Sequence, residues 1–145
     1  MAAHVVKKVS AMDYRTPAEF VGHSTGYSGD DVVDEAAGAV QMGFRVARLE
    51  PGGSVDSHVH SWEESVYVTS GSLTVDTSEG SVELVTGDYG LLPVGSTHAF
   101  RNTSAEAVTF STKLPAGRTQ LQTWFLDGEG REICGAYYVI VRRMR

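Results

Sequence analysis

The sequence has little cysteine, few basic residues and no long apolar run. Cys134 is alone in a chain of 145 residues, so no disulfide can form within it, which fits a reducing cytoplasm. The net charge of -6 and the pI of about 5.3 argue against a general nucleic-acid surface, because such surfaces are basic. No apolar stretch approaches the ~18 residues that a membrane span requires, and residues 1–10 lack a signal-peptide pattern. We therefore expect a cytoplasmic protein that binds neither nucleic acid nor membrane.

Glycine, by contrast, is abundant, and the apolar runs are short. The 16 glycines exceed the usual ~7% of residues, and glycine is weak inside helices but useful in turns. Turn residues separate about eight to ten short runs with strand character, which is typical of an all-β sandwich or barrel. No helix long enough to connect parallel strands is predicted. The expected strands cover residues 40–49, 65–69, 73–77, 82–85, 91–92, 99–102 and 108–114, with further apolar runs at 121–126 and 133–141.

This pattern divides the chain, a single domain by its length, into three parts. Residues 1–37 are the least regular and are expected to form an N-terminal arm. Within it we expect one helical turn at 16–21, followed by a surface excursion at 22–38 that is rich in Gly, Ser and Asp. Residues 38–118 contain the strands of the barrel. Residues 119–145 are expected to complete the barrel or to form a dimer interface.

Three histidines and a glutamate have the spacing of a metal site. His58 and His60 lie two positions apart, so on a strand both side chains face the same side, and Glu64 continues this parity. His98 follows a turn marked by Pro and Gly at 93–97, and it comes from another strand. Imidazole nitrogen and carboxylate oxygen are ligands that divalent first-row metals favour. Four protein ligands leave one or two coordination positions open, as in a catalytic site, whereas structural zinc sites are closed.

The same residues belong to two motifs that resemble those of the cupin superfamily. The first, G-x5-H-x-H-x3-E-x6-G, extends from Gly52 to Gly71, and the second, G-x5-P-x-G-x2-H-x3-N, extends from Gly87 to Asn102, with every spacing matched. The resemblance implies an all-β fold, the double-stranded β-helix or jelly roll, with a metal inside the barrel. The metal would be divalent Mn, Fe, Ni, Zn or Cu. The resemblance also implies a ligand set of His58, His60, Glu64 and His98.

Residues that bind a substrate are sought among the aromatic and basic side chains. Trp62, Phe100 and Phe110 lie in or beside the motif strands, where they either line a pocket or pack in the core. Arg45 and Arg48 precede the first motif, and one of them should point inward. An inward arginine would hold a substrate carboxylate, and the alternative is a surface ion pair. We take Arg45 as the substrate-binding candidate.

Glu64 and Tyr89 are the candidates for moving a proton during catalysis. Together with the metal they predict an enzyme acting on a small oxygen-rich substrate that chelates the ion. The reaction would be dioxygenase-like or a redox-neutral isomerisation, lyase or decarboxylation reaction. Cupins span all these activities, so the resemblance selects none of them. The alternatives are a non-enzymatic domain that binds or senses a small molecule, and one lobe related to two-lobed cupins. The resemblance also implies a homodimer.

Overall fold

Almost all regular structure in the chain is β-strand. The computed structural model describes residues 6–39, 42–114, 124–126 and 132–135, and no helix in these ranges is long and apolar enough to cross a membrane. The elements are η1 (Val9–Ala11), η2 (Ala18–Phe20), β1 (Ser24–Val33), β2 (Gly43–His58), β3 (Glu64–Ser70), β4 (Ser72–Thr77), β5 (Gly80–Val85), β6 (Tyr89–Leu92), β7 (His98–Arg101), β8 (Val108–Leu114), β9 (Trp124–Leu126) and β10 (Glu132–Gly135).

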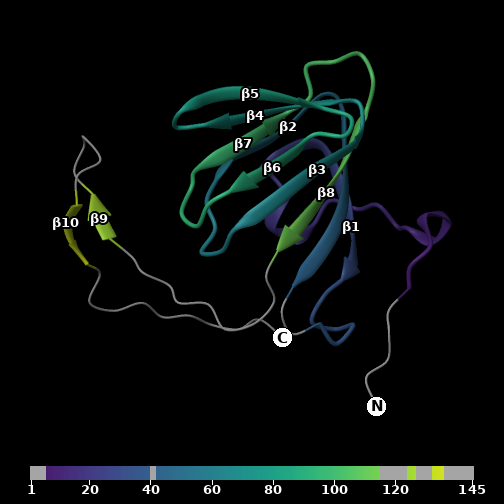
Figure 1. Cartoon of the computed structure of the whole chain (residues 1–145), viewed down its shortest axis with the longest axis horizontal. Coiled ribbons are helices and arrows are strands. Elements are labelled where there is room, and N and C mark those ends of the chain that lie inside the picture. Colours follow the sequence, from purple (N-terminus) through teal and green to yellow (C-terminus); the bar gives the residue numbers. More distant parts are fainter. Residues whose placement is uncertain (1–5, 40–41, 115–123, 127–131, 136–145) are drawn as a thin grey trace.

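Strands β1 to β8 form one antiparallel sheet that curls into a nearly closed barrel (Figure 1). The order across the sheet is β5-β4-β7-β2-β8-β3-β6, with β1 paired to β2 beside this path. The ends of the order are β5 and β6, so the seam of the barrel runs between them. Strands β9 and β10 form a separate antiparallel pair. The all-β jelly roll that the sequence predicted is confirmed.

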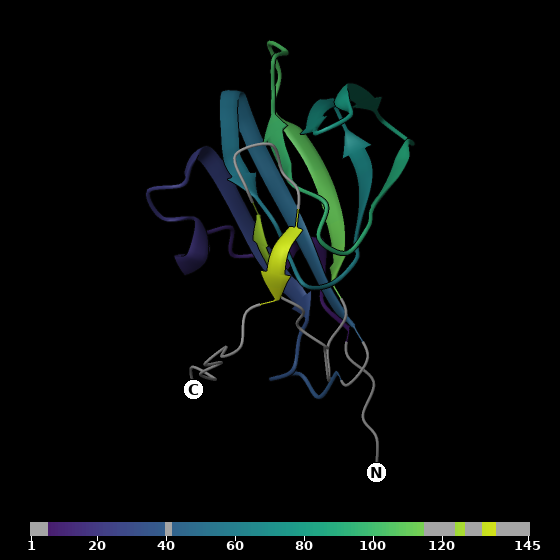
Figure 2. The same ribbon diagram turned by 90° about the vertical axis from the view of Figure 1, so that its left-hand side faces the viewer.

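Strand β2 runs the length of the barrel beside β1 and β8 (Figure 2). Its residues 43–49 pair with β8, and its residues 54–58 pair with β7. The sequence predicted that the strand ends near Pro51, but it continues to His58. Gly52 adopts a φ of +70°, a conformation that favours glycine, so the turn residues bend β2 instead of ending it. Continued pairing with β7 holds the strand together beyond the bend.

The core follows the alternation of the strands. In β3, Glu64, Val66 and Val68 are buried, and in β7 the buried residues are His98 and Phe100. The alternation that packs the barrel therefore also turns Glu64 and His98 inward. The buried apolar residues of the described chain are Tyr27, Ala47, Leu49, Val55, Val66, Val68, Leu73, Val75, Leu92, Phe100, Val108 and Phe110.

The N-terminal part is more ordered than the sequence indicated. The expected surface excursion at 22–38 is wrong for Ser24–Val33, which form β1. Pairing with β2 satisfies the backbone of this polar segment, and only Tyr27 and Gly29 within it are buried. The helical turn is the short 3-10 helix η2. The division of the chain into three parts stays a prediction, and most of residues 119–145 lie outside the described ranges.

Candidate metal centre

The four predicted ligands come together from three strand ends and one connection. His58 is the last residue of β2, Glu64 is the first of β3, and His98 is the first of β7. His60 lies in the connection between β2 and β3. Because β2 and β7 pair with His58 opposite His98, the two motifs meet in the sheet itself. One ligand atom from each residue lies within 4.8 Å of the others, so this His/His/Glu/His group can hold a metal ion.

Hydrogen bonds to the backbone orient two of the imidazoles. His58 Nδ1 lies 2.8 Å from the Asp56 carbonyl oxygen, and His98 Nδ1 lies 2.9 Å from that of Ser96. A carbonyl only accepts, so each Nδ1 carries the proton and donates it. The Nε2 atoms therefore keep their lone pairs, which is the arrangement found in histidines that ligate a metal.

The Glu64 carboxylate lies between two imidazoles. Its Oε2 is 3.3 Å from His60 Nε2 and 3.1 Å from His98 Nε2. Burial lowers the pKa of His58 and of His60, and the nearby His98 adds to this effect. Burial also acts to lower the pKa of His98, but the Glu64 carboxylate and the Ser96 carbonyl outweigh it, so that pKa is raised. His58 and His60 are thus neutral near pH 7 and can donate an electron pair to a metal. At His98 a proton competes with the metal cation for the imidazole nitrogen.

A cavity of about 460 Å³ opens beside the His/His/Glu/His group. Apolar and aromatic side chains dominate its walls. Two buried nitrogens at the site, His60 Nδ1 and Trp62 Nε1, have no hydrogen-bond partner among the described residues. The lining residues are Glu19, Phe20, Tyr27, Arg45, Val55, His58, Val59, His60, Trp62, Glu64, Phe100 and Thr112.

The structure brings some of the other candidate residues to this cavity and not others. Trp62 and Phe100 line it, whereas Phe110 is fully buried in the core and packs against Phe100 with ring centroids 5.6 Å apart. Tyr89 is 62% exposed on β6 and contacts Ser65 Oγ at 2.8 Å, outside the cavity.

Arg45 also lines the cavity, but acidic side chains already surround its guanidinium. Its Nε lies 2.7 Å from Asp31 Oδ1, and its Nη1 lies 3.1 Å from Glu19 Oε1. The side chain is only 12% exposed. Arg45 thus combines the two alternatives considered for it, because it faces the cavity while forming ion pairs.

Six lining residues were not anticipated: Glu19, Phe20, Tyr27, Val55, Val59 and Thr112. Phe20 packs edge-on against the His58 ring with centroids 5.4 Å apart, and Tyr27 packs in the same way on Phe20 at 5.1 Å. Both come from the N-terminal segment. The signal available in the sequence was the presence of large aromatic residues, Tyr14, Phe20 and Tyr27, in this segment, which is unexpected for a solvated arm.

Comparison with known proteins agrees with this barrel and site. Residues 45–112 match the family model of the cupin domain, and a curated relative, protein SchB of Streptomyces halstedii, is 41% identical over 68 residues. That alignment covers 46% of this chain and 49% of SchB, so the chain spans about half the length of the curated relative it matches.

Solved structures share the fold over a larger part of the chain. The polyketide cyclase RemF of Streptomyces resistomycificus superposes with a TM-score of 0.70 at 22% identity, covering 86% of this chain and 89% of its own. A cupin-superfamily sugar phosphate isomerase of Silicibacter pomeroyi gives 0.62 at 28% identity, covering 73% and 72%. A predicted oxalate decarboxylase of Thermotoga maritima gives 0.67 at 23% identity, covering 77% and 98%.

The fold and site define a jelly-roll protein with a group of side chains able to hold a metal inside its barrel. The chain carries a small domain of the cupin superfamily. Its structural neighbours include a cyclase, an isomerase and a predicted decarboxylase, so the fold does not select one activity.

Proposed function

We propose that the protein is a metal-dependent enzyme that acts on a small, oxygen-rich organic substrate at the His/His/Glu/His group. The observation that carries this proposal is the convergence of four ligand atoms, within 4.8 Å of one another, beside a cavity of about 460 Å³. Structural metal sites are closed, whereas catalytic ones keep room for a substrate. A bound divalent ion would act as a Lewis acid toward substrate oxygens that chelate it.

The charges around the cavity favour an uncharged substrate. Among the described lining residues, Arg45 is the one permanently cationic side chain, and it is paired with two carboxylates, Asp31 and Glu19. Apart from the metal itself, a phosphate or a carboxylate of the substrate would therefore find no unpaired cation among these side chains. We propose a ketone, a phenol or a related compound with two adjacent oxygens.

Glu64 is proposed to move the proton. Its Oε2 faces His60 and His98, whereas none of the hydrogen bonds or ion pairs of the described residues involves Oε1. The carboxylate can therefore keep Oε2 in the ligand group while Oε1 accepts a proton from the substrate. Tyr89 is not part of this proposal, because it lies outside the cavity.

The first test is the metal content of the His98→Ala variant. Protein purified without chelators is expected to contain close to one transition-metal ion per chain, measured by elemental mass spectrometry. His98→Ala should lose most of it, because only three ligands remain and Glu64 loses one of its two imidazole partners. His23→Ala is the matched control, since this exposed histidine is not part of the ligand group and its side chain faces the exposed carboxylate of Asp56. A wild-type protein with almost no metal, or a variant that keeps its metal, would contradict the ligand assignment.

The second test is turnover by protein loaded with Mn(II), Fe(II), Ni(II), Cu(II) or Zn(II). Oxygen uptake and substrate absorbance are followed with 1,3-diketones, catechols and flavonols. Oxygen consumption supports a dioxygenase, and substrate loss without oxygen supports a redox-neutral enzyme. Tight binding without turnover across the panel would contradict the enzymatic proposal and favour a small-molecule-binding protein.

A further inference from the structure

We propose that the Tyr27 hydroxyl donates a hydrogen bond to a substrate oxygen that does not contact the metal, and that Arg45 positions this hydroxyl. The inference rests on the proposed function in one respect, because it takes the cavity as the substrate site. It adds a second point of recognition at the wall built from the N-terminal segment and identifies Arg45 as a positioning residue.

Strand β1 turns Tyr27 into the cavity. Tyr27 is 6% exposed and lies opposite Leu49 in the pairing with β2. Its ring packs against Phe20 and, at 6.4 Å between centroids, against Phe110. Because the ring is fixed on these two sides, its hydroxyl has a defined position on the cavity wall.

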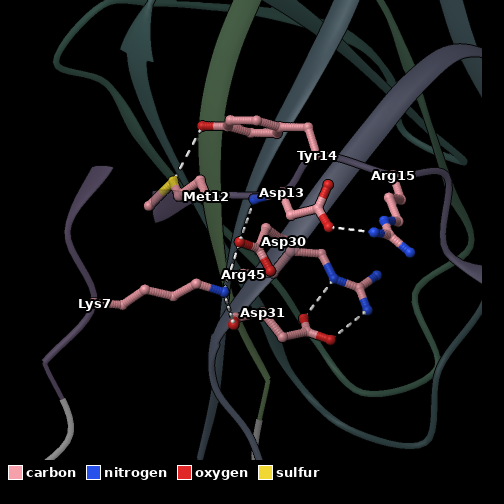
Figure 3. Close-up of polar contacts among 8 residues, drawn as sticks. All are labelled: Lys7, Met12, Asp13, Tyr14, Arg15, Asp30, Asp31 and Arg45. Atoms are coloured by element: carbon pink, nitrogen blue, oxygen red, sulfur yellow. Dashed lines mark hydrogen bonds and ion pairs between the residues drawn. The ribbon is translucent and has the colours of Figure 1, made fainter. Parts of the chain in front are cut away.

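Arg45 is held beside Tyr27 by two carboxylates. Its Nε and Nη2 contact Asp31 Oδ1 at 2.7 Å and Oδ2 at 3.2 Å, a bidentate pair that Figure 3 shows. Its Nη1 contacts Glu19 Oε1 at 3.1 Å. Arg45 and Tyr27 both line the cavity, and the Arg45 side chain passes over Gly29, the next residue to Tyr27 on that face of β1. One cation thus joins β1, β2 and η2 at the cavity wall.

The absence of a side chain at Gly29 gives the Arg45 side chain room to extend toward Tyr27. Asp31 lies opposite Arg45 in the sheet, and Gly29 lies between Asp31 and Tyr27 on the same face of β1. A Cβ atom at Gly29 would lie 3.0 Å from Arg45 Cδ and 3.3 Å from its Cγ. A larger residue would therefore displace the arginine, so glycine at this position is needed for the arrangement.

The arrangement makes the phenol a donor. In the proposed contact the Tyr27 oxygen accepts from Arg45, because a guanidinium can only donate, and the phenol proton points elsewhere. None of the hydrogen bonds of the described residues commits that proton to another group of the protein. Burial raises the pKa of Tyr27 to about 12, against the opposing effect of Arg45, so the phenol is protonated at neutral pH. A donor that also accepts from a cation is polarised and forms a stronger bond.

The test compares two chelating probes that differ by one remote oxygen. Catechol has only the two adjacent oxygens, whereas 3,4-dihydroxyacetophenone has an additional carbonyl. Affinities are measured by titrating Co(II)-loaded protein and following its visible spectrum, which reports binding at the metal without turnover. Tyr27→Phe removes the hydroxyl and keeps the ring that packs against Phe20 and Phe110.

We expect Tyr27→Phe to weaken 3,4-dihydroxyacetophenone about 3- to 10-fold and to leave catechol and Co(II) affinity unchanged, as for the loss of one hydrogen bond. Tyr14→Phe is the control, because the Tyr14 hydroxyl contacts Met12 Sδ at 3.2 Å outside the cavity (Figure 3). Equal losses for both probes, or none for the acetophenone, would overturn the assignment of Tyr27.

Arg45→Lys tests the positioning role. Lysine keeps the charge but cannot contact Asp31, Glu19 and Tyr27 together. We expect the same selective loss for the acetophenone, and no further loss when Tyr27→Phe is added. Additive losses would show that Arg45 acts independently of Tyr27 and would overturn this part. Failure of the wild-type protein to bind Co(II) or catechol is a distinct result, which contradicts the proposed function itself.

Discussion

At the residue scale, Asn102 shows how a polar side chain joins segments that the barrel must keep together. Its Nδ2 donates to the carbonyl oxygens of Leu49 at 2.9 Å and Glu106 at 2.8 Å. Its Oδ1 accepts from the backbone N of Ser104 at 3.0 Å and from its Oγ at 2.7 Å. The residue is 1% exposed, so water cannot replace these partners. Asn102 therefore ties β2 to the connection that leads into β8.

Replacing Asn102 by alanine is expected to destabilise the protein by roughly 2–3 kcal/mol, because buried carbonyl groups lose their donor. Ser104→Ala is the matched control, and with only hydroxyl contacts removed it should cost about 0.5–1.5 kcal/mol. Urea unfolding followed by circular dichroism measures both. An Asn102→Ala variant as stable as the control would show that the amide network contributes little.

The residues of the metal group were predictable and the recognition residues were not, for a physical reason. His58, His60 and Glu64 lie so close in sequence that they must be near one another in space. The strand parity predicted for them was wrong, because β2 ends at His58 and β3 begins only at Glu64. What Arg45 does depends on Asp31 and Glu19, which lie in other elements. Pattern alone cannot show such partners, because they become neighbours only when the strands pair.

At the element scale, the packing of β1 on β2 depends on close backbone approach at Gly53. A Cβ atom there would lie 2.8 Å from the Glu50 carbonyl oxygen, 2.9 Å from Leu49 Cδ1 and 2.9 Å from the Thr25 carbonyl oxygen. Two of these neighbours are backbone atoms that cannot rotate away. Gly53 therefore permits the bend of β2 to lie against the start of β1.

Gly53→Ala is expected to cost about 1–3 kcal/mol, as for an overpacked site. Hydrogen exchange should become faster in β1, which carries Tyr27, than in β3. Gly90→Ala is the control, because a Cβ there would meet only Leu84 Cδ1, at 3.3 Å, at the end of a side chain that can move. Equal effects of the two substitutions would argue against the close approach as the cause.

The β1 segment was missed because its sequence lacks the usual strand signal. It contains glycine, serine and two aspartates, residues depleted in strands. Its stability comes from pairing along β2 and from contacts such as that between Lys7 Nζ and Asp30 Oδ2 at 2.6 Å (Figure 3). These are tertiary interactions, so local composition could not indicate them.

At the scale of the whole molecule, a bound metal should stabilise the fold, because the four ligands are brought together only in the folded chain. A metal at about 100 times its Kd adds ~2.7 kcal/mol, which corresponds to a rise in Tm of roughly 5–10 °C for a domain of this size. Differential scanning calorimetry with Ni(II) or Zn(II), followed by EDTA, measures the rise and its reversal. His98→Ala should show neither, and a rise that persists in this variant would indicate metal binding elsewhere.

The same rise should shrink as the pH is lowered from about 7.5 to about 5.5, because coordination requires neutral imidazole. The pKa of His98 is raised, so a proton competes for its Nε2 at a higher pH than at His58 and His60, whose pKa values are lowered. Metal affinity is therefore lost on the acid side, beginning with His98. A Tm shift independent of pH in this range would exclude the histidines as ligands.

An all-β sandwich or barrel was accessible from the glycine-marked turns and short alternating strands, and the jelly roll followed from the resemblance to the cupin motifs. The order of the strands was not, because β2 pairs with β7 and β8, both distant from it in the chain. The substrate likewise depends on side chains gathered from all parts of the barrel.

The central place of β2 has a consequence for how the chain reaches its native state. Two partners of β2, β7 and β8, follow it after several intervening strands, so these pairings span long stretches of sequence. Chains dominated by such distant pairings fold in milliseconds to seconds, more slowly than helical bundles. During synthesis on the ribosome, the ladder between β2 and β8 can be completed only after residue 114 has emerged. During that interval the edge of β2 that later pairs with β8 is open to other chains, which exposes the growing chain to aggregation.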